Sequence, residues 1–392
     1  MRVLFVVTSY PRFVGDVITP WLVELIRRLK SRGVDISVFT SSYRGLGNQV
    51  IAGVRVFRFR YFLKRFERLT HEETAVDRMT RGPINFLLPL FYLAFGCRAI
   101  ARLTKHEKFD IVHVHWPFPH VLFGVLGKRF GQARLYSSFY GVEVRLLKKK
   151  MAVLRRPFSA LVNKSDRVTA ISNHTAEELC GIVRKPVEII PFSAAADGRA
   201  GKTSDKHEIL FVGRLVSRKG VRYLLEGFHL IHKSVPHRLV IIGSGQQRGQ
   251  LEAMAVELGI ADRVVFTGMV SDEDLNRYYR SCSFLVLPAV YDEKGDTEGL
   301  GVVLLEAMSC GKPVIASGVG GITDIVVDQR NGLLVPPADA DALARAIMTL
   351  VKNDRLRREM GRAARKTVDE KFNWDKIVGD MLRLYGYSNG SK

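Results

Sequence analysis

The stretch ILFVGRLVSRKGVRYLLEGFHLIH, residues 209–232, contains one complete strand, loop and helix. Residues 209–212 are consecutive apolar residues, which is typical of a strand buried on both faces. Residues 220–232 place their apolar residues at helical spacing, after a loop that contains glycine and several bases. Parallel sheets are built from such units, so this stretch predicts an α/β fold.

The same unit recurs almost from end to end of the chain. Further apolar runs predict strands at residues 2–8, 35–40, 111–115, 135–139, 168–171, 187–190, 239–242, 264–267, 284–287 and 314–316. Amphipathic segments predict helices at residues 247–258, 272–281, 302–309, 340–351 and 355–372. An earlier helix is bracketed by Pro20 and Gly33. The pattern indicates two Rossmann-like, doubly wound domains facing across a cleft.

A small, polar stretch, SAAADGRAGKTSDK at residues 193–206, is typical of a linker. We therefore expect one domain at residues 1–192 and a second at residues 207–372. In doubly wound folds, ligands bind at the carboxyl ends of the parallel strands. The cleft between the two predicted sheets is the expected ligand site.

The composition indicates a cytoplasmic protein. The chain has 392 residues, 47% of them hydrophobic, which is enough for two ordinary cores. Its four cysteines are far apart and show neither metal nor redox spacing, as expected of reduced thiols. The opening residues MRVLFVVTS lack a cleavage site and predict a buried strand instead of a signal peptide.

Positive charge is concentrated in the first half of the chain. Of the formal net charge of +21, residues 1–192 carry 32 Lys+Arg against 14 Asp+Glu, and residues 193–392 carry 28 against 25. This asymmetry indicates that the first half contacts a polyanion, either an anionic membrane surface, a phosphorylated lipid or nucleic acid. The longest apolar run, residues 84–97, contains Pro89 and is too short to span a bilayer. It could lie in a membrane interface beside Arg98, Arg102 and the basic, aromatic residues 55–68, or pack as a core helix beside a strand pair.

Two loops in the second half are suited to an anion. VGRLVSRKG, residues 212–220, places Gly213, Arg214 and Lys219 between a strand and a helix N-terminus, where cations and backbone N–H groups can bind phosphate. Gly243 begins a G-x-G turn after the next strand, which either admits a ligand or is only a tight turn.

The sequence TEGLGVVLLEAM, residues 297–308, carries two carboxylates around a glycine-rich core. Glu298 is expected on a loop and Glu306 inside the helix that follows. A glycosidase-like acid/base pair is one alternative. The neighbouring cations and amide turns favour an anionic ligand, with the carboxylates bound to its hydroxyl groups.

Metal binding has little support in the sequence. Ser271 and Asp274 are expected to form a helix capping box instead of a metal motif. His113 and His115 share one face of a strand and are expected to be buried and hydrogen-bonded.

Taken together, these motifs resemble the retaining, GT-B-fold glycosyltransferases of family 4, also called group 1 glycosyl transferases. TEGLGVVLLEAMSCGKPVIAS resembles the family's Glu-(seven residues)-Glu region with the strand that follows it. VGRLVSRKG resembles its donor-phosphate segment, and SYPRFVGDVITPWLVELIRRLKSRGVDISVFT its N-terminal loop, helix and second strand. The resemblance extends over the whole chain.

The resemblance implies a role for each matching residue. Arg214 and Lys219 would bind the donor diphosphate and stabilise the departing nucleoside diphosphate. Glu306 would bind the ribose and Glu298 the transferred sugar. Further donor contacts would come from Gly213, Gly243, Gly299, Leu300, Gly301 and Val302. No metal or other cofactor is expected, since the nucleotide-sugar is a substrate.

The sequence departs from the family pattern in the first domain. Many relatives have a histidine where this chain has Tyr140, and tyrosine does not become a cation near neutral pH. A second glycine is often found where this chain has Asp16 after Gly15, so Asp16 is expected either to contact the acceptor or to cap the following helix. Tyr140 is still taken as a catalytic candidate, and Gly15, Asp16 and His115 as acceptor-side candidates. The family also predicts that the last helix, residues 373–388, packs back on the first domain.

These expectations converge on a retaining glycosyltransferase at the inner face of the cell membrane. Its partners would be a nucleotide-sugar donor, a saccharide or lipid-linked acceptor and an anionic membrane surface, without nucleic acid. Alternatives are a soluble-acceptor synthase of the sucrose or trehalose kind and a basic nucleic-acid-binding protein. Donor, acceptor and oligomeric state are not readable from the sequence.

Overall fold

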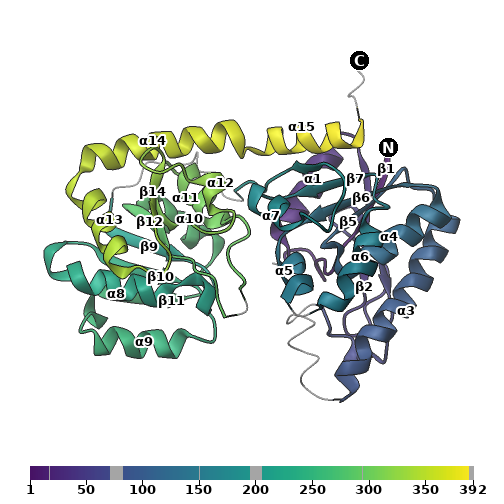
Figure 1. Cartoon of the computed structure of the whole chain (residues 1–392), viewed down its shortest axis with the longest axis horizontal. Helices are drawn as coiled ribbons and strands as arrows, with labels where there is room; N and C mark the ends of the chain where they lie inside the picture. The colour runs from purple at the N-terminus through teal and green to yellow at the C-terminus, as the bar shows by residue number, and fades with distance from the viewer. Residues whose placement is uncertain (17, 71–82, 150, 195–204, 294, 388–392) are drawn as a thin grey trace. The chain divides into compact units, whose positions relative to one another are not determined.

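The computed structural model describes residues 1–16, 18–70, 83–149, 151–194, 205–293 and 295–387. The chain divides into two compact units (Figure 1). Unit 1 contains residues 1–171, 176–190 and the chain from residue 378 onward, and unit 2 contains residues 172–175 and 191–377. Most of the linker predicted at residues 193–206 lies outside the described residues.

Unit 1 is built on an eight-stranded sheet with the order β3-β4-β2-β1-β5-β6-β7-β8. Neighbouring strands are parallel, except that β3 pairs antiparallel with β4. The strands are β1 (Arg2–Val6), β2 (Asp35–Ser41), β3 (Gln49–Ile51), β4 (Val54–Phe59), β5 (Ile111–His115), β6 (Arg134–Phe139), β7 (Arg167–Ala170) and β8 (Val187–Ile189). Their buried apolar residues fit a sheet covered on both faces.

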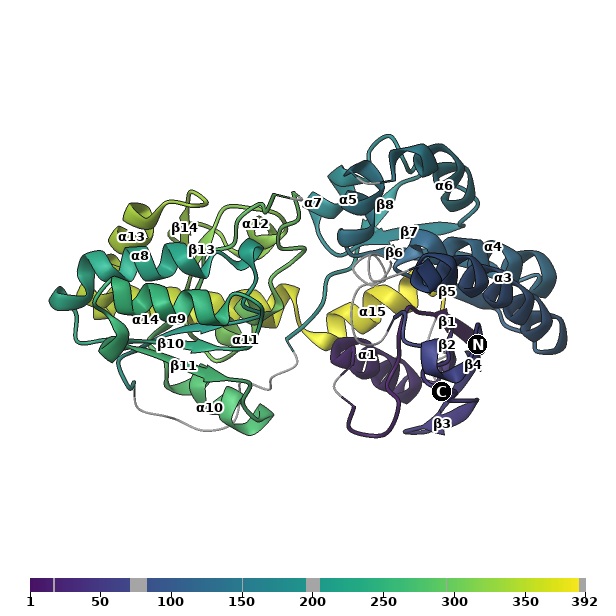
Figure 2. The ribbon, with the colours of Figure 1, turned by 90° about the horizontal axis from the view of Figure 1, so that it is seen from below.

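Helices cover both faces of this sheet, with α3 and α4 on one face and α1 on the other (Figure 2). The α-helices are α1 (Pro20–Ser31), α3 (Pro83–His106), α4 (Pro117–Gly131), α5 (Val142–Lys149), α6 (Arg155–Val162) and α7 (Asn173–Glu178), with the 3-10 helices η1 (Lys64–Phe66) and η2 (Ala152–Leu154). The helix predicted after Pro20 is confirmed, because α1 begins at that proline and buries Leu22, Leu25, Ile26 and Leu29 on one face.

Helix α3 is longer than the sequence analysis predicts. It continues through Pro89 to His106, and by length and composition residues 87–106 could cross a membrane. The core helix of a soluble protein meets the same criterion. Leu88, Tyr92 and Ile100 of α3 lie in the core of unit 1 and α3 packs against α4, so tertiary packing holds the helix beyond the apolar run.

Unit 2 has a six-stranded parallel sheet with the order β11-β10-β9-β12-β13-β14. The strands are β9 (Glu208–Val212), β10 (Arg238–Ile242), β11 (Val264–Gly268), β12 (Phe284–Leu287), β13 (Val314–Ser317) and β14 (Gly332–Val335). Except for β14, each was predicted within one residue at either end.

The helices of unit 2 lie in two layers around this sheet (Figure 1). The α-helices are α8 (Val221–Ile231), α9 (Arg248–Glu257), α10 (Asp272–Ser281), α11 (Val302–Ser309), α12 (Ile322–Ile325), α13 (Ala340–Lys352) and α14 (Asp354–Lys371), with the 3-10 helices η3 (Ser217–Lys219), η4 (His232–Ser234) and η5 (Ala261–Arg263). Helix α8 packs against α13, and α11 packs against α10 and α14. The capping prediction at α10 is confirmed, because the Ser271 side chain accepts a hydrogen bond from the backbone N–H of Asp274.

The last helix, α15 (Trp374–Tyr385), contributes to both units. Its first residues belong to unit 2, where the Trp374 indole donates to the Ala194 carbonyl at 3.0 Å. From Val378 onward it belongs to unit 1. There the Tyr385 hydroxyl is 2.7 Å from His113 Nδ1, so the end of α15 is anchored in that core.

Each sheet has one point where the strand order changes direction. In unit 1 the chain runs outward from β1 through β2 on one side and from β5 through β6 on the other. In unit 2 the corresponding neighbours are β9 and β12. Loops diverge at the carboxyl ends of such strand pairs and leave a crevice, which is where ligands bind in doubly wound folds.

Candidate active site

Two loops meet at the switch point of unit 2. One runs from β9 through η3 to α8, and the other runs from β12 to α11. Gly220 allows this approach, since its φ is +66° and a Cβ there would lie 1.8 Å from the Pro288 carbonyl oxygen. The backbone N–H of Val290 also donates to the Arg218 carbonyl at 2.9 Å. These contacts hold residues 68 and 72 positions apart in the chain side by side.

An ion-pair cluster joins the two loops. Lys219 Nζ lies 2.5 Å and Arg218 Nη1 lies 3.4 Å from Glu298 Oε2, and the Lys219 and Glu298 side chains are only 9% and 14% exposed. Burial raises the pKa of Glu298, but the nearby charges of Lys219 and Arg218 outweigh it, and the pKa is lowered overall. Glu298 is therefore ionised at neutral pH.

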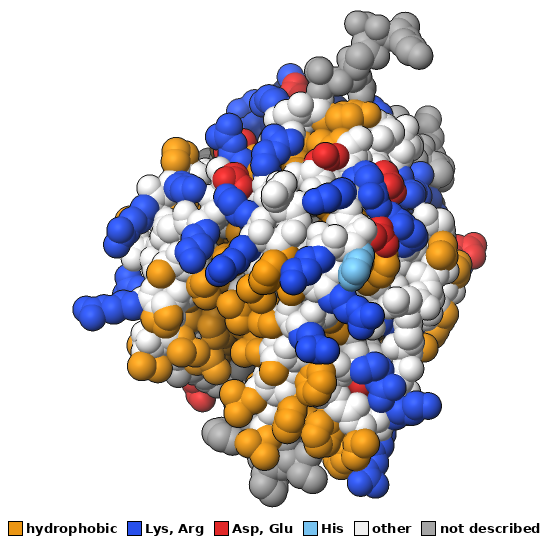
Figure 3. Space-filling view, turned by 90° about the vertical axis from the view of Figure 1, so that its right-hand side faces the viewer, with side chains coloured by type: hydrophobic (Ala, Val, Ile, Leu, Met, Phe, Trp, Pro, Cys, Tyr) orange, Lys and Arg blue, Asp and Glu red, His pale blue; other side chains and the backbone are white. Residues whose placement is uncertain are grey.

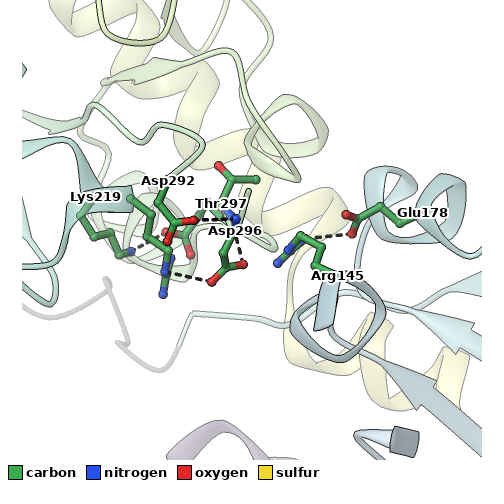
Figure 4. A network of polar contacts seen from close by, with 8 residues as sticks. Arg145, Glu178, Lys219, Asp292, Asp296 and Thr297 are labelled. Atoms are coloured by element: carbon green, nitrogen blue, oxygen red, sulfur yellow. Dashed lines mark hydrogen bonds and ion pairs between the residues drawn. The ribbon is translucent and has the colours of Figure 1, made fainter. Parts of the chain in front are cut away.

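The segment before Glu298 is held by its own hydrogen bonds. The Asp296 backbone N–H donates to the Asp292 carboxylate at 2.9 Å, and the Thr297 N–H donates to Asp296 Oδ1 at 3.0 Å. Arg218 Nε lies 3.4 Å from Asp296 Oδ2, so the same guanidinium contacts both acidic residues. Figure 4 shows Lys219, Asp292, Asp296 and Thr297 gathered around these contacts. Arg218 and Asp296 were not selected from the sequence, because their role depends on which loop lies opposite.

The glycine-rich residues after Glu298 lead directly into α11. Gly301 precedes the helix with φ +91°, Val302 is its first residue, and Leu300 is buried. Gly321 donates its backbone N–H to the Glu298 carbonyl at 3.1 Å, and a Cβ on Gly321 would lie 2.0 Å from the Gly299 carbonyl oxygen. The loop after β13 thus packs directly on the loop that carries Glu298, and fixes it.

Glu306 lies in α11, as predicted. Its Oε2 accepts a hydrogen bond from the buried Tyr279 hydroxyl at 2.5 Å. Burial raises the pKa of Glu306, while the bond from Tyr279 opposes that shift. Tyr279, from α10, orients this carboxylate and could not be identified from sequence spacing alone.

Gly213 and Gly243 have a packing role in the structure. A Cβ on Gly243 would lie 2.0 Å from the Gly213 carbonyl oxygen, and Leu215 N–H donates to the Ser244 carbonyl at 2.8 Å. The G-x-G turn therefore lets two loops touch, which accounts for the glycine at position 243 without a ligand. Arg214, which follows Gly213 in the chain, is exposed, and its charge helps to lower the pKa of Glu298.

In unit 1, the loop after β1 carries Gly15 and Asp16. Gly15 is exposed with φ +90°. Asp16 accepts from the Arg12 backbone N–H at 2.9 Å and from Arg12 Nε at 2.7 Å, and these bonds lower its pKa. Of the two alternatives for Asp16, the one in which it caps α1 is wrong, because Thr19 occupies the cap position without a side-chain bond to the helix. Asp16 instead closes its own loop through Arg12.

Three neutral groups surround the end of β5. His113 lies 2.7 Å from both Tyr385 and Ser138, and His115 Nδ1 lies 2.6 Å from the Tyr140 hydroxyl. Burial lowers the pKa of His113 to about 3, lowers that of His115 well below its usual value and raises that of Tyr140 well above its own. The prediction of buried, hydrogen-bonded histidines is confirmed. His115 Nε2 has no hydrogen-bond partner among the described residues.

Further polar residues of unit 1 follow Tyr140 and were missed by the sequence analysis. Glu143 accepts from the Tyr140 backbone N–H at 2.7 Å, and burial raises its pKa to about 7. Arg145 Nη1 lies 2.8 Å from Glu178 Oε2, a pair that Figure 4 also labels. The carboxylate after Gly141 was visible in the sequence, but its burial was not.

The predicted residues thus form two groups, one at the carboxyl end of each sheet. The unit 2 group combines cations, backbone amides near helix starts and two carboxylates, a set suited to an anion that also carries hydroxyl groups. In the unit 1 group, His115 and Tyr140 are neutral and aromatic, and Asp16 is paired with Arg12. Among the described residues, no group of three or more His, Cys, Asp or Glu side chains could hold a metal ion.

Comparison with known proteins agrees with this geometry. The family model described as glycosyl transferases group 1 matches residues 194–367, and the model for glycosyltransferase family 4 matches residues 21–192. The chain is 30% identical over 313 residues to the GDP-mannose-dependent alpha-(1-6)-phosphatidylinositol monomannoside mannosyltransferase of Mycolicibacterium smegmatis, covering 76% of this chain and 81% of that protein. It is 26% identical over 400 residues to the N-acetyl-alpha-D-glucosaminyl L-malate synthase of Bacillus anthracis, covering 98% and 97%.

Among solved structures, the HepE protein of Anabaena in complex with UDP is similar over 99% of this chain and 100% of its own, with a TM-score of 0.75 and 16% identity. This likeness confirms the predicted fold class, two Rossmann-like domains of the GT-B type. Because the two family models together match most of both units, the chain belongs to the group 1 glycosyltransferases, family 4.

Proposed function

We propose that this glycosyltransferase is retaining and moves a sugar from a nucleoside-diphosphate-sugar donor to a hydroxyl group of a lipid-linked or cell-surface saccharide. The observation that carries the donor assignment is the cluster of Arg218, Lys219 and Glu298 at the switch point of unit 2. The cations of this cluster can bind the phosphate groups of a sugar diphosphate, and its buried, ionised carboxylate can accept hydrogen bonds from the sugar hydroxyls.

Lys219 and Arg214 bind the diphosphate in this proposal. An ammonium group has three N–H donors, and Glu298 engages only one side of it, so others remain for phosphate oxygens. Arg214 is exposed on the same loop and adds a bidentate donor. When the bond to the sugar breaks, negative charge collects on the departing diphosphate, and fixed cations stabilise it without reorganisation.

The two carboxylates bind hydroxyl groups of the same donor. Glu298 is ionised and accepts from hydroxyls of the transferred sugar, while backbone atoms of residues 299–302 contact the sugar and phosphate. Glu306 accepts from the ribose, in an orientation fixed by Tyr279. Retention follows either from front-side attack within an ion pair or from a short-lived intermediate.

The acceptor assignment draws on the charge of unit 1 and on one relative. Residues 1–192 carry 32 Lys+Arg against 14 Asp+Glu, which favours an acceptor at an anionic membrane face. The Mycolicibacterium relative is named for a phosphatidylinositol acceptor. The Bacillus relative is named for malate, which favours a soluble acceptor as the second candidate.

The donor assignment is tested by titrating the protein with UDP, GDP and ADP and their common sugars. Losing hydrogen bonds to a charged group costs about 1.5–3 kcal/mol, so Glu306→Gln is expected to weaken nucleotide binding at least about tenfold. Arg214→Ala is expected mainly to lower turnover. Arg222→Ala, an exposed position on α8, is the control and keeps both. Normal binding and transfer in Glu306→Gln and Arg214→Ala would contradict the assignment.

The acceptor and the stereochemistry are tested with lipid extracts and the donor that binds. A glycosylated lipid whose new anomeric centre has the donor's configuration by NMR supports the proposal. Transfer to a soluble acceptor without a lipid product would establish the second candidate, and an inverted anomeric centre would exclude retention.

A further inference from the structure

Helix α3 presents one fixed face to the outside of unit 1. Its opposite face carries Leu88, Tyr92, Gly96 and Ile100 and packs on α4. Gly96 sets the closeness of this contact, because a Cβ there would lie 2.4 Å from the Phe123 ring. The helix cannot rotate to bury its outer face without losing this packing.

The first half of the outer face is apolar. Exposed fractions are 49% for Leu87, 64% for Leu90, 38% for Phe91 and 47% for Phe95. The two residues before η1 join this surface, since the Phe62 and Phe91 rings lie 5.2 Å apart and Leu63 is 59% exposed. We call Leu63, Leu87, Leu90, Phe91 and Phe95 the α3 patch. Large contiguous apolar surfaces of this kind usually mark an interaction site.

The second half of the same face is basic. Positions 91, 95, 98 and 102 follow at spacings of three or four, so Arg98 and Arg102 continue the line of the α3 patch along the helix. Lys105 extends the line, and Lys64 and Arg65 of η1 are exposed beside the apolar residues. Helix α3 contains no Asp or Glu. Figure 3 shows hydrophobic side chains gathered on this side of the molecule, next to many Lys and Arg side chains and few acidic ones.

We propose that the α3 patch, together with the bases that continue it along the helix, is a docking surface for the interface of an anionic lipid bilayer. The apolar half enters the boundary between headgroups and acyl chains, and Arg98, Arg102 and Lys105 bind the anionic headgroups. An apolar surface that continues into bases along a single helix is the pattern of an interfacial membrane helix.

Two other occupants fit the surface less well. Spanning the bilayer would remove Leu88, Tyr92 and Ile100 from the core of unit 1, although residues 87–106 are long enough. A second copy of the chain would place these bases opposite identical bases, which like-charge repulsion disfavours. An anionic lipid surface carries the negative charges that these bases attract.

The inference rests on the proposed function only in its purpose, which is to bring unit 1 to a lipid-linked acceptor. Binding of lipid does not require the donor site. Vesicle binding and nucleotide binding are therefore measured separately, and either can fail while the other succeeds.

The experiment uses the full chain in flotation with vesicles of phosphatidylcholine, with or without about one third phosphatidylglycerol. Leu90→Ser/Phe91→Ser is expected to lower the partition coefficient at least about tenfold, because each side chain loses a favourable transfer into lipid. Arg98→Gln/Arg102→Gln is expected to lower it about fivefold for each base, only on anionic vesicles and less at high salt.

Matched controls come from unit 2. Val256→Ser replaces an apolar residue that is 67% exposed, and Arg355→Gln/Arg358→Gln removes two exposed bases. Both controls are expected to bind vesicles like the wild-type chain. Unchanged melting temperatures show that loss of binding in the α3 variants is not loss of fold.

Three results would overturn the proposal. The first is wild-type chain that does not float with anionic vesicles, and the second is equal binding by the α3 variants and their controls. The third is that the protein is not extracted from native membranes by high salt or alkali and is released only by detergent, which would indicate a spanning helix. Concentration-dependent dimers that disappear in Leu90→Ser/Phe91→Ser, without vesicle binding, would assign the surface to a second copy.

Discussion

The pair between Lys219 and Glu298 gives the sharpest test of the site. Replacing Lys219 by Met removes the cation that lies 2.5 Å from a carboxylate whose side chain is only 14% exposed. Breaking a buried ion pair from one side costs about 3–5 kcal/mol, because the remaining charge stays buried without its partner. Arg218 still lies 3.4 Å from Glu298, so the lower end of this range, about 3 kcal/mol, is expected.

For a domain of the size of unit 2, each kcal/mol shifts the melting temperature by about 2–4 °C, so Lys219→Met is expected to lower it by about 6–12 °C. Lys219→Met/Glu298→Gln removes both charges and is expected to recover most of this loss. The double variant is still expected to bind nucleotide-sugar poorly. Differential scanning calorimetry measures the stability change, and nucleotide titration measures the functional one.

The pH dependence of the same pair has a defined sign. The pKa of Glu298 is lowered from 4.5 in the folded chain, so its stabilisation is fully present above about pH 4.5 and is lost as the pH falls through the folded pKa. The stability difference between Glu298→Gln and the wild type should be constant from about pH 6 to 8 and shrink in acid. The reasoning is refuted if Lys219→Met leaves the melting temperature unchanged, or if the double variant loses the sum of the single losses.

Two further substitutions test the neutral cluster of unit 1. Tyr140→Phe removes the hydrogen bond between the Tyr140 hydroxyl and His115 Nδ1, and is expected to lower the free energy of unfolding by about 1–3 kcal/mol in a melting experiment. It is also expected to slow transfer but to leave nucleotide affinity unchanged, because the donor residues lie in unit 2. Weaker nucleotide binding would contradict this division of roles. Glu143 has a pKa raised from 4.5 to about 7, so the wild type should lose stability as the pH rises through this window. Glu143→Gln should lack that loss, so the melting temperatures of the two proteins should diverge as the pH rises from about 4 to 8 in a fluorimetric assay. An equal difference between them at every pH would show that the carboxyl is not buried.

The central strands and most helices could be predicted because burial on two faces leaves unbroken apolar runs. No range was predicted for the inner strand β4 or for α4, and two short strands at the sheet edges were also missed. Strand β3 is three residues long, half-exposed and antiparallel, and β14 is a four-residue edge strand, so neither shows such a run. The apolar run at residues 84–97 ends before α3 does, because packing on α4 holds the helix as far as His106.

The candidate site was predicted as far as single loops allow. Lys219 and Glu298 stood out because their local sequence places charge beside glycine at a strand end. Their direct contact and the part of Arg218 depend on two loops meeting across 79 and 80 positions, and the part of Tyr279 depends on α10 packing on α11, 27 positions along the chain. No local pattern encodes either contact. The packing role of Gly243 was equally hidden, since the atom that excludes a side chain there belongs to another loop.

The electrostatic difference between the two switch points constrains the proposed reaction. At the end of β5, burial keeps His115 and Tyr140 neutral, with the pKa of His115 lowered and that of Tyr140 raised, so neither exchanges a proton near neutral pH. The ion-pair cluster of Arg218, Lys219 and Glu298 lies in unit 2. In the proposed transfer, the proton of the acceptor hydroxyl passes to an oxygen of the departing diphosphate, whose negative charge Lys219 and Arg214 stabilise. A histidine restored at position 140 would not be needed for that step, because the group that gains basicity as the bond breaks is the leaving group itself.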